Sequence, residues 1–208
     1  MGAVRLVGLN YASNYDDASR YEAWAEAQRR EYPFRVITVT EPHTGIRGND
    51  YWRWKPRIIA DALRTLGGDE ALLYFDTQDT HTQDCFDFCG AYLAQHDVLL
   101  YQNYHNHISY TKADCYVLMG CTAFFDERPM QCEAGLIGMR HTPRSLAVLD
   151  EWSRWMAIDA IVDDSPSLHP NYPSFIEHRW DQSVLTNIAL LRGIPLVQIP
   201  GVSTNERQ

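Results

Sequence analysis

The chain has 208 residues, enough for one domain with its own core, and 45% of them are hydrophobic. Its formal net charge of −9 argues against broad nucleic-acid binding, which needs a basic surface. No apolar run approaches the roughly 18 residues of a membrane span, and the first residues lack the pattern of a secretory signal. We therefore expect a soluble, intracellular (cytoplasmic) protein with no membrane span and no nucleic-acid partner.

Strand and helix patterns alternate along the chain. Strands are expected at 4–9, 35–39, 71–75, 98–101, 134–139 and 196–199, and helices at 18–30, 56–66, 84–95, 144–156 and 181–192. Loops or irregular segments are expected at 41–50, 102–131 and 159–177. This order predicts an α/β fold with a mostly parallel central sheet in one Rossmann-like α/β/α domain, residues 1–208.

The strongest local motif follows the apolar strand at 71–75. It reads Asp76-Thr77-Gln78-Asp79 and lies where ligands bind in α/β sheets, at the carboxyl end of a strand. Two carboxylates there can hold Mg²⁺ or Mn²⁺, although an acidic turn that caps the next helix is an equal alternative. A phosphatase of the haloacid-dehalogenase type would also place aspartates after a strand, but Gln78 occupies its second acidic position.

A second motif combines aromatic and cationic residues at the start of a helix. It runs from Tyr51 through Trp54 and Lys55 to Pro56 and Arg57. A helix N-terminus attracts anions, and Lys55 adds a charge suited to a diphosphate. The alternative is that the tryptophans anchor the core and the cations are solvated.

A third motif, His178-Arg179-Trp180-Asp181-Gln182-Ser183, opens the last predicted helix. Asp181 and Gln182 can face sugar hydroxyls, with His178 as a further ligand or donor. Asp181 could instead be a first-turn carboxylate that favours the helix dipole. Lys112, beside Asp114 in the irregular segment, is a further candidate cation.

Taken in order, these motifs resemble a known family. Tyr-Trp-x-Trp-Lys-Pro, then Tyr-x-Asp, Thr-Lys-x-Asp and His-Arg-x-Asp-Gln-Ser are similar to small GT-A-fold glycosyltransferases of bacterial surface-polysaccharide loci and large algal viruses. The resemblance covers about residues 10–199 and implies a GT-A-like nucleotide-diphospho-sugar transferase fold. It also implies a hexosyltransferase-like enzyme that uses a nucleotide-sugar, usually a UDP-sugar, with Mn²⁺ or Mg²⁺ and a glycan acceptor.

The resemblance also implies roles for individual residues. The metal would be held by Asp76 and Asp79, and Asp181 with Gln182 would be catalytic, beside the transferred sugar and the acceptor. The donor-binding residues would be Asn10, Tyr11, Trp54, Lys55, Asp76, Lys112 and His178. The family usually has Asp-x-Asp, whereas this chain has Asp76-Thr77-Gln78-Asp79, so the principal metal ligand stays open.

The expected reaction is displacement at the anomeric carbon of the donor sugar. The Asp-Gln pair resembles retaining enzymes of the family and favours retention over inversion. Two alternatives remain: a metal-dependent phosphohydrolase that uses the same aspartates, and a non-catalytic module that binds sugars or nucleotide-sugars. The first would release inorganic phosphate, and the second would bind the donor without consuming it.

Overall fold

Six strands form a central sheet in the order β2-β1-β3-β6-β5-β7 in the computed structural model, which describes residues 4–14, 18–42 and 44–203. They are β1 (Arg5–Asn14), β2 (Val36–Pro42), β3 (Glu70–Phe75), β5 (Val98–Asn106), β6 (Met130–Arg140) and β7 (Leu196–Val197). β1 is parallel to β2 and β3, and β5 is parallel to β7, whereas β6 is antiparallel to both β3 and β5. The expected α/β class with a mostly parallel sheet is therefore confirmed.

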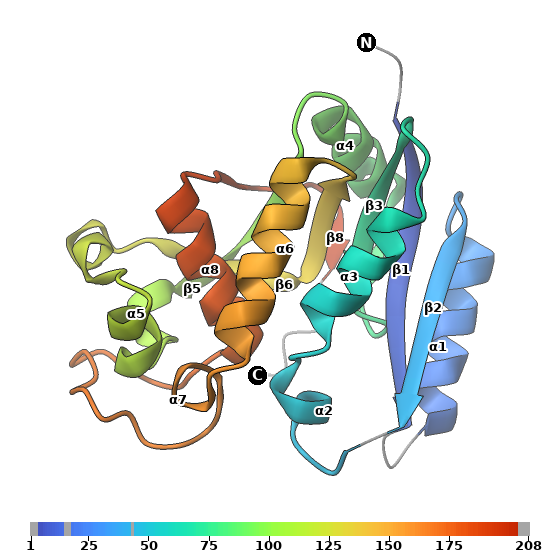
Figure 1. Cartoon of the computed structure of the whole chain (residues 1–208). Coiled ribbons are helices and arrows are strands. Elements are labelled where there is room, and N and C mark those ends of the chain that lie inside the picture. Colours follow the sequence, from blue (N-terminus) through green and yellow to red (C-terminus); the bar gives the residue numbers. More distant parts are fainter. Residues whose placement is uncertain (1–3, 15–17, 43, 204–208) are drawn as a thin grey trace.

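Helices cover both faces of this sheet (Figure 1). α1 (Ala18–Glu31) and α4 (Gln83–Leu93) lie behind it, and α3 (Lys55–Arg64), α6 (Pro143–Met156) and α8 (Trp180–Arg192) lie in front. Shorter elements complete the described chain: α2 (Gly48–Tyr51), β4 (Thr80–His81), η1 (His107–Ser109), α5 (Ala113–Leu118), η2 (Thr122–Glu127), α7 (Asp159–Val162) and β8 (Val202–Ser203). None of the helices in the described ranges is long and apolar enough for a membrane span.

The two faces of β1 divide the hydrophobic residues between two cores. Leu9 and Tyr11 belong to the core under α3, α6 and α8, while the intervening Asn10 points to the α1 side, where it bonds to Gln28. On that same side, a Cβ at Gly8 would come within 2.9 Å of Phe75. Glycine at this position therefore allows close packing of the sheet against the second core.

Several boundaries differ from the sequence expectations. β1 continues to Asn14, so Asn10 and Tyr11 lie within the strand and not after it. The polar Asn10 hides this continuation in the sequence, but its pairing with β2 persists and its amide finds a buried partner. The segment expected to be irregular holds the end of β5, η1, α5, η2 and the start of β6, and the two expected loops contain α2 and α7.

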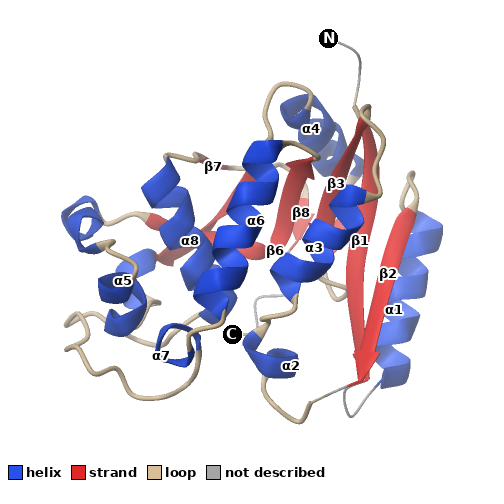
Figure 2. Ribbon diagram, viewed as in Figure 1, coloured by secondary structure: helices blue, strands red, loops and turns tan. Residues whose placement is uncertain are grey.

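Because β6 runs antiparallel to its neighbours, one edge of the sheet combines the ends of several strands with the start of β6 (Figure 2). The carboxyl ends of β1, β2 and β3 meet there, and β6 begins at the same edge because it runs the opposite way. Residues at the start of β6 therefore lie beside residues that follow β3.

Candidate active site

The loop after β3 places two carboxylates at this edge. β3 is covered on both faces, and the chain leaves it at Asp76, whose side chain is 28% exposed, while Asp79 is 4% exposed. The loop is a tight turn in which Asp79 N donates to Asp76 O at 3.1 Å. The Tyr74 hydroxyl donates to Asp76 Oδ1 at 2.6 Å and fixes the orientation of that carboxylate.

Gly135 in β6 marks the point where three carboxylates converge. A Cβ on Gly135 would lie 3.1 Å from Asp79 Oδ2, 3.2 Å from Asp76 Oδ2 and 3.4 Å from Glu133 Oε1. Burial, and then the negative charge of Asp76, raises the pKa of Glu133 to about 7. Glycine thus keeps side-chain atoms out of a space edged by carboxylate oxygens. In the described part of the chain, no group of three His, Cys, Asp or Glu side chains is arranged to hold a metal ion.

A buried ion pair joins α3 and α8 next to this point. Lys55 Nζ lies 2.9 Å from Asp181 Oδ2 and 3.8 Å from Asp76 Oδ1, and it donates to the carbonyl of Ala134 at 3.0 Å. The side chains of Lys55 and Asp181 are only 2% and 7% exposed. Burial opposes the charge on Lys55, but the nearby carboxylates outweigh it and raise the Lys55 pKa. Lys55 is therefore an internal counter-ion, and its expected contact with donor phosphates stays a prediction.

Gln182, the other residue expected to be catalytic, is anchored to the sheet. Its Oε1 accepts from Ala134 N at 3.3 Å, and its Nε2 donates to Gln131 Oε1 at 2.8 Å. Because both ends of the amide contact β6, this side chain fixes the first turn of α8 against the start of β6. Gln182 thus lies beside Asp181 with its polar atoms already bonded.

Asn10 contributes from the opposite face of the sheet. Its Nδ2 donates to Gln28 Oε1 at 2.7 Å, and Gln28 Nε2 donates to Asp76 O at 3.1 Å and to Asp79 O at 3.0 Å. Asn10 is fully buried, so its side chain contacts the acidic loop through Gln28. The role expected for Asn10, at a nucleotide base, remains untested.

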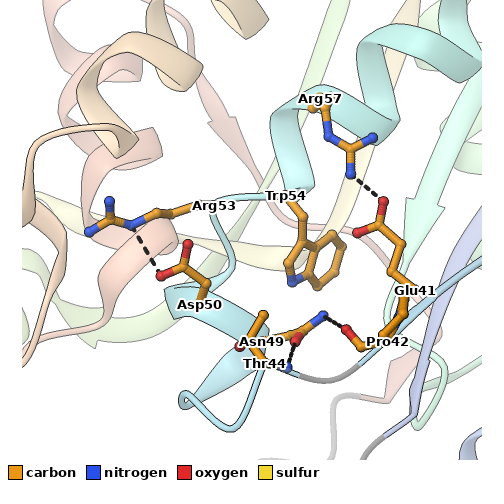
Figure 3. A pocket seen from close by; sticks show the side chains of 8 residues that line it. All are labelled: Glu41, Pro42, Thr44, Asn49, Asp50, Arg53, Trp54 and Arg57. Atoms are coloured by element: carbon orange, nitrogen blue, oxygen red, sulfur yellow. Dashed lines mark hydrogen bonds and ion pairs between the residues drawn. The ribbon is translucent and has the colours of Figure 1, made fainter.

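Trp54 lines a pocket at the same edge (Figure 3), and its ring stacks on that of Tyr11. Their ring centroids are 3.6 Å apart and their planes differ by 15°. The pocket has a volume of about 460 Å³ and is lined by Glu41, Pro42, Thr44, Asn49, Asp50, Arg53, Trp54 and Arg57. The lining combines the Trp54 ring and an amide with two arginines, each paired with a carboxylate of the same lining: Arg57 with Glu41 and Arg53 with Asp50. An aromatic wall beside polar groups suits a flat, polar ligand.

The backbone that borders this pocket is left-handed. Five consecutive residues, Gly48 to Trp52, have φ between 53° and 75°. Asn49 holds the turn because its Nδ2 donates to the Tyr11 hydroxyl at 2.5 Å and its Oδ1 accepts from Thr44 N at 2.7 Å. Left-handed residues other than glycine cost about 1–2 kcal/mol each, and such strain clusters at functional sites.

Lys112 and His178 belong to a second polar cluster. Lys112 Nζ donates to Asp163 O at 2.7 Å and to Asp163 Oδ1 at 2.9 Å, and His178 Nδ1 accepts from Lys112 N at 3.3 Å. Burial, and then the charge of Lys112, lowers the pKa of His178 to about 3. The bonds that these two residues make therefore join α5 to the segment after α7, and their expected donor contacts stay predictions.

Comparisons with known proteins give structural similarity but no family. No protein-family model matches the sequence, and no curated protein is significantly similar to it. Mouse xyloside xylosyltransferase 1, in its apo form, has a TM-score of 0.49 at 9% identity, over 94% of this chain and 85% of that one. Galactosyltransferase LgtC, in complex with donor and acceptor sugar analogues, has a TM-score of 0.49 at 10% identity, over 88% and 70%.

A third similar structure is a glycosyltransferase involved in glycosylation of the major capsid of PBCV-1. Its TM-score is 0.42 at 10% identity, over 72% of this chain and 65% of that one. At such identities, and with TM-scores below 0.5, these similarities do not assign a function to this chain.

Proposed function

We propose that the chain is a metal-dependent GT-A-type glycosyltransferase that transfers a sugar from a nucleotide-sugar, in particular a UDP-sugar, to a glycan acceptor. The observation that carries this proposal is the convergence of three carboxylates on Gly135, beside the buried pair of Lys55 and Asp181. The cluster lies at the carboxyl ends of parallel strands, where α/β sheets bind their ligands. The motif order described above supports the same assignment.

The residues at this point fit Mn²⁺ or Mg²⁺. Asp76 and Asp79 would hold the cation, because hard divalent ions prefer oxygen ligands, and a Cβ at Gly135 would fill the space between the two carboxylates. When bound, the cation would neutralise charge that develops on the diphosphate leaving group.

The pocket beside Trp54 is the proposed site for the nucleotide part of the donor. Its volume of about 460 Å³ lies within the roughly 300–1,000 Å³ of small-molecule sites. Arg53 and Arg57 line it, paired with Asp50 and Glu41, and a guanidinium has five N–H donors, so donors remain for a polar ligand. Trp54 in the pocket lining directly precedes Lys55, which lies 3.8 Å from Asp76. We propose that the diphosphate of a nucleotide in the pocket lies on the side of the carboxylate cluster.

Asp181 is the carboxylate proposed to face the transferred sugar. Burial raises the pKa of Asp181, and the Lys55 charge 2.9 Å away opposes that rise. In its ionised form the carboxylate would stabilise the positive charge that develops at the anomeric carbon. We propose retention, in which the bond to the phosphate breaks as the acceptor oxygen bonds on the same face. A leaving-phosphate oxygen then takes the proton of the acceptor hydroxyl.

Calorimetric titration with UDP, GDP, ADP and UDP-sugars, with Mn²⁺ or with chelator, tests the proposal. We expect binding that depends on metal and is lost in Asp79→Asn, whereas Asp69→Asn, which removes an exposed carboxylate, keeps it. Consumption of the donor must then depend on a glycan acceptor. Absence of nucleotide binding with every metal would overturn the proposal, and release of inorganic phosphate would favour the phosphohydrolase. Binding without turnover would favour the binding module.

A further inference from the structure

One side-chain amide links the two candidate metal ligands from outside the carboxylate cluster. We propose that Gln28 is a positioning residue, which holds the backbone of Asp76 and Asp79 so that their carboxylates converge on a divalent cation. The inference rests on the proposed function and assigns a determinant of the metal site to α1, a helix on the opposite face of the sheet from α3 and α8 (Figure 1).

The side-chain amide of Gln28 bonds to two carbonyl oxygens of the loop. Its Nε2 carries two N–H groups, and its two acceptors are Asp76 O at 3.1 Å and Asp79 O at 3.0 Å. Both carbonyls are therefore drawn toward α1, while the carboxylate oxygens of the same two residues lie 3.2 and 3.1 Å from the Cβ position of Gly135. One amide thus sets the spacing of both carboxylates.

Asn10 fixes the orientation of the Gln28 amide. Its Nδ2 donates to Gln28 Oε1 at 2.7 Å, so the amide of Gln28 must turn its nitrogen toward the loop. A flipped Gln28 would place its oxygen against two carbonyl oxygens, which repel it. This chain of hydrogen bonds, called the relay below, therefore runs from Asn10 in β1 through Gln28 in α1 to the acidic loop. It is satisfied by only one orientation of the Gln28 amide.

The relay is maintained at a cost in stability. Asn10 is fully buried and Gln28 is 5% exposed, and Asn10 Oδ1 has no hydrogen-bond partner among the described residues. A buried polar atom left unpaired destabilises the folded state, and an apolar pair of the same size would avoid that loss. Such an arrangement is expected where orientation of a functional loop matters more than stability.

Mn²⁺ binding to the purified chain tests this role, measured by calorimetry with and without saturating UDP. Gln28→Met keeps the volume but removes the donor, and Gln28→Asn keeps an amide that is one methylene too short to reach the loop. We expect either variant to weaken Mn²⁺ binding about tenfold or more, as loss of residues that orient metal ligands commonly does. Asn187→Ala is the matched control, because Asn187 is a fully buried amide bonded to His107 instead.

A merely structural role predicts a different pattern. The control and the Gln28 variants would then lose similar stability in urea unfolding, and all would bind Mn²⁺ as the wild type does at temperatures where they stay folded. Unchanged Mn²⁺ affinity in both folded Gln28 variants would overturn the positioning role and leave the proposed function intact. Absence of Mn²⁺ binding in the wild type, even with UDP, would overturn both proposals.

Discussion

Removal of the Lys55 charge should destabilise the protein in a way that depends on pH. Lys55 and Asp181 are almost fully buried and 2.9 Å apart. At an effective dielectric of about 20, their mutual attraction is roughly 6 kcal/mol. The substitution Lys55→Met keeps most of the side-chain volume but leaves Asp181 charged and unpaired inside the protein. Breaking a buried pair in this way typically costs about 3–5 kcal/mol.

Protonation of Asp181 limits how much stability the Lys55→Met variant can lose. Raising a carboxyl pKa from about 3.9 to pH 7 corresponds to about 4 kcal/mol, and the same shift to pH 5 to about 1.5 kcal/mol. In the variant, the folded state takes up a proton more readily than the unfolded state, so the deficit relative to wild type shrinks as pH falls. We therefore expect Lys55→Met to lose about 4 kcal/mol at pH 7 and about 1.5 kcal/mol at pH 5.

Urea unfolding of wild type and variant at both pH values measures these differences. Arg5→Met is the matched control, because Arg5 pairs with Asp69 at the same 2.9 Å but both side chains are more than 60% exposed. We expect no measurable change in that control, since solvent screens exposed pairs. The reasoning would be refuted if Lys55→Met lost less than about 1 kcal/mol at pH 7, or lost the same amount at both pH values. Either result would mean that Asp181 is not left as a buried, unpaired charge in the variant.

Three further outcomes follow from particular sites. Gly135→Ala should weaken Mn²⁺ binding at least tenfold in calorimetry, because its Cβ would press on the oxygens of Asp76 and Asp79, and unchanged affinity would remove Gly135 from the site. Gly90→Ala, inside α4, places its methyl group in ordinary van der Waals contact with Leu6 at 4.0 Å and should raise stability by about 0.5–1 kcal/mol in thermal unfolding, and a loss would contradict that packing. Burial lowers the pKa of His107 to about 4, so folding excludes a proton that the unfolded chain binds below about pH 6.5. The stability deficit of His107→Gln relative to wild type should therefore shrink by about 2 kcal/mol from pH 7.5 to pH 5 in urea unfolding, and a constant deficit would refute the shift.

The parts of the site with local sequence signals could be predicted. Asp76 and Asp79 follow a continuous apolar strand, and Lys55 and Asp181 begin helices, so periodicity alone places them at element ends. Alternation of strands and helices likewise predicts the α/β class. These inferences succeed because each depends on a few neighbouring residues.

The missed residues depend on pairing between distant segments. Glu133 and Gly135 belong to the site because β6 runs antiparallel, which brings the beginning of a strand to an edge where strand ends were expected. Gln28 lies near the end of α1, where a polar residue normally faces solvent. The pairing of Lys112 with Asp163, 51 residues later, likewise has no local pattern that reveals it, and the expected donor contact of Lys112 stays a prediction.

The left-handed turn of Gly48–Trp52 has a consequence in stereochemistry. Its backbone is the mirror image of an ordinary helical turn, so the natural chirality of its four non-glycine residues works against the shape that borders the pocket. A chemically assembled chain with a D-amino acid at position 50, where φ is 75°, should accept the opposite hand without loss of the fold. At this one turn, the protein is built more easily from the enantiomer that ribosomes do not use.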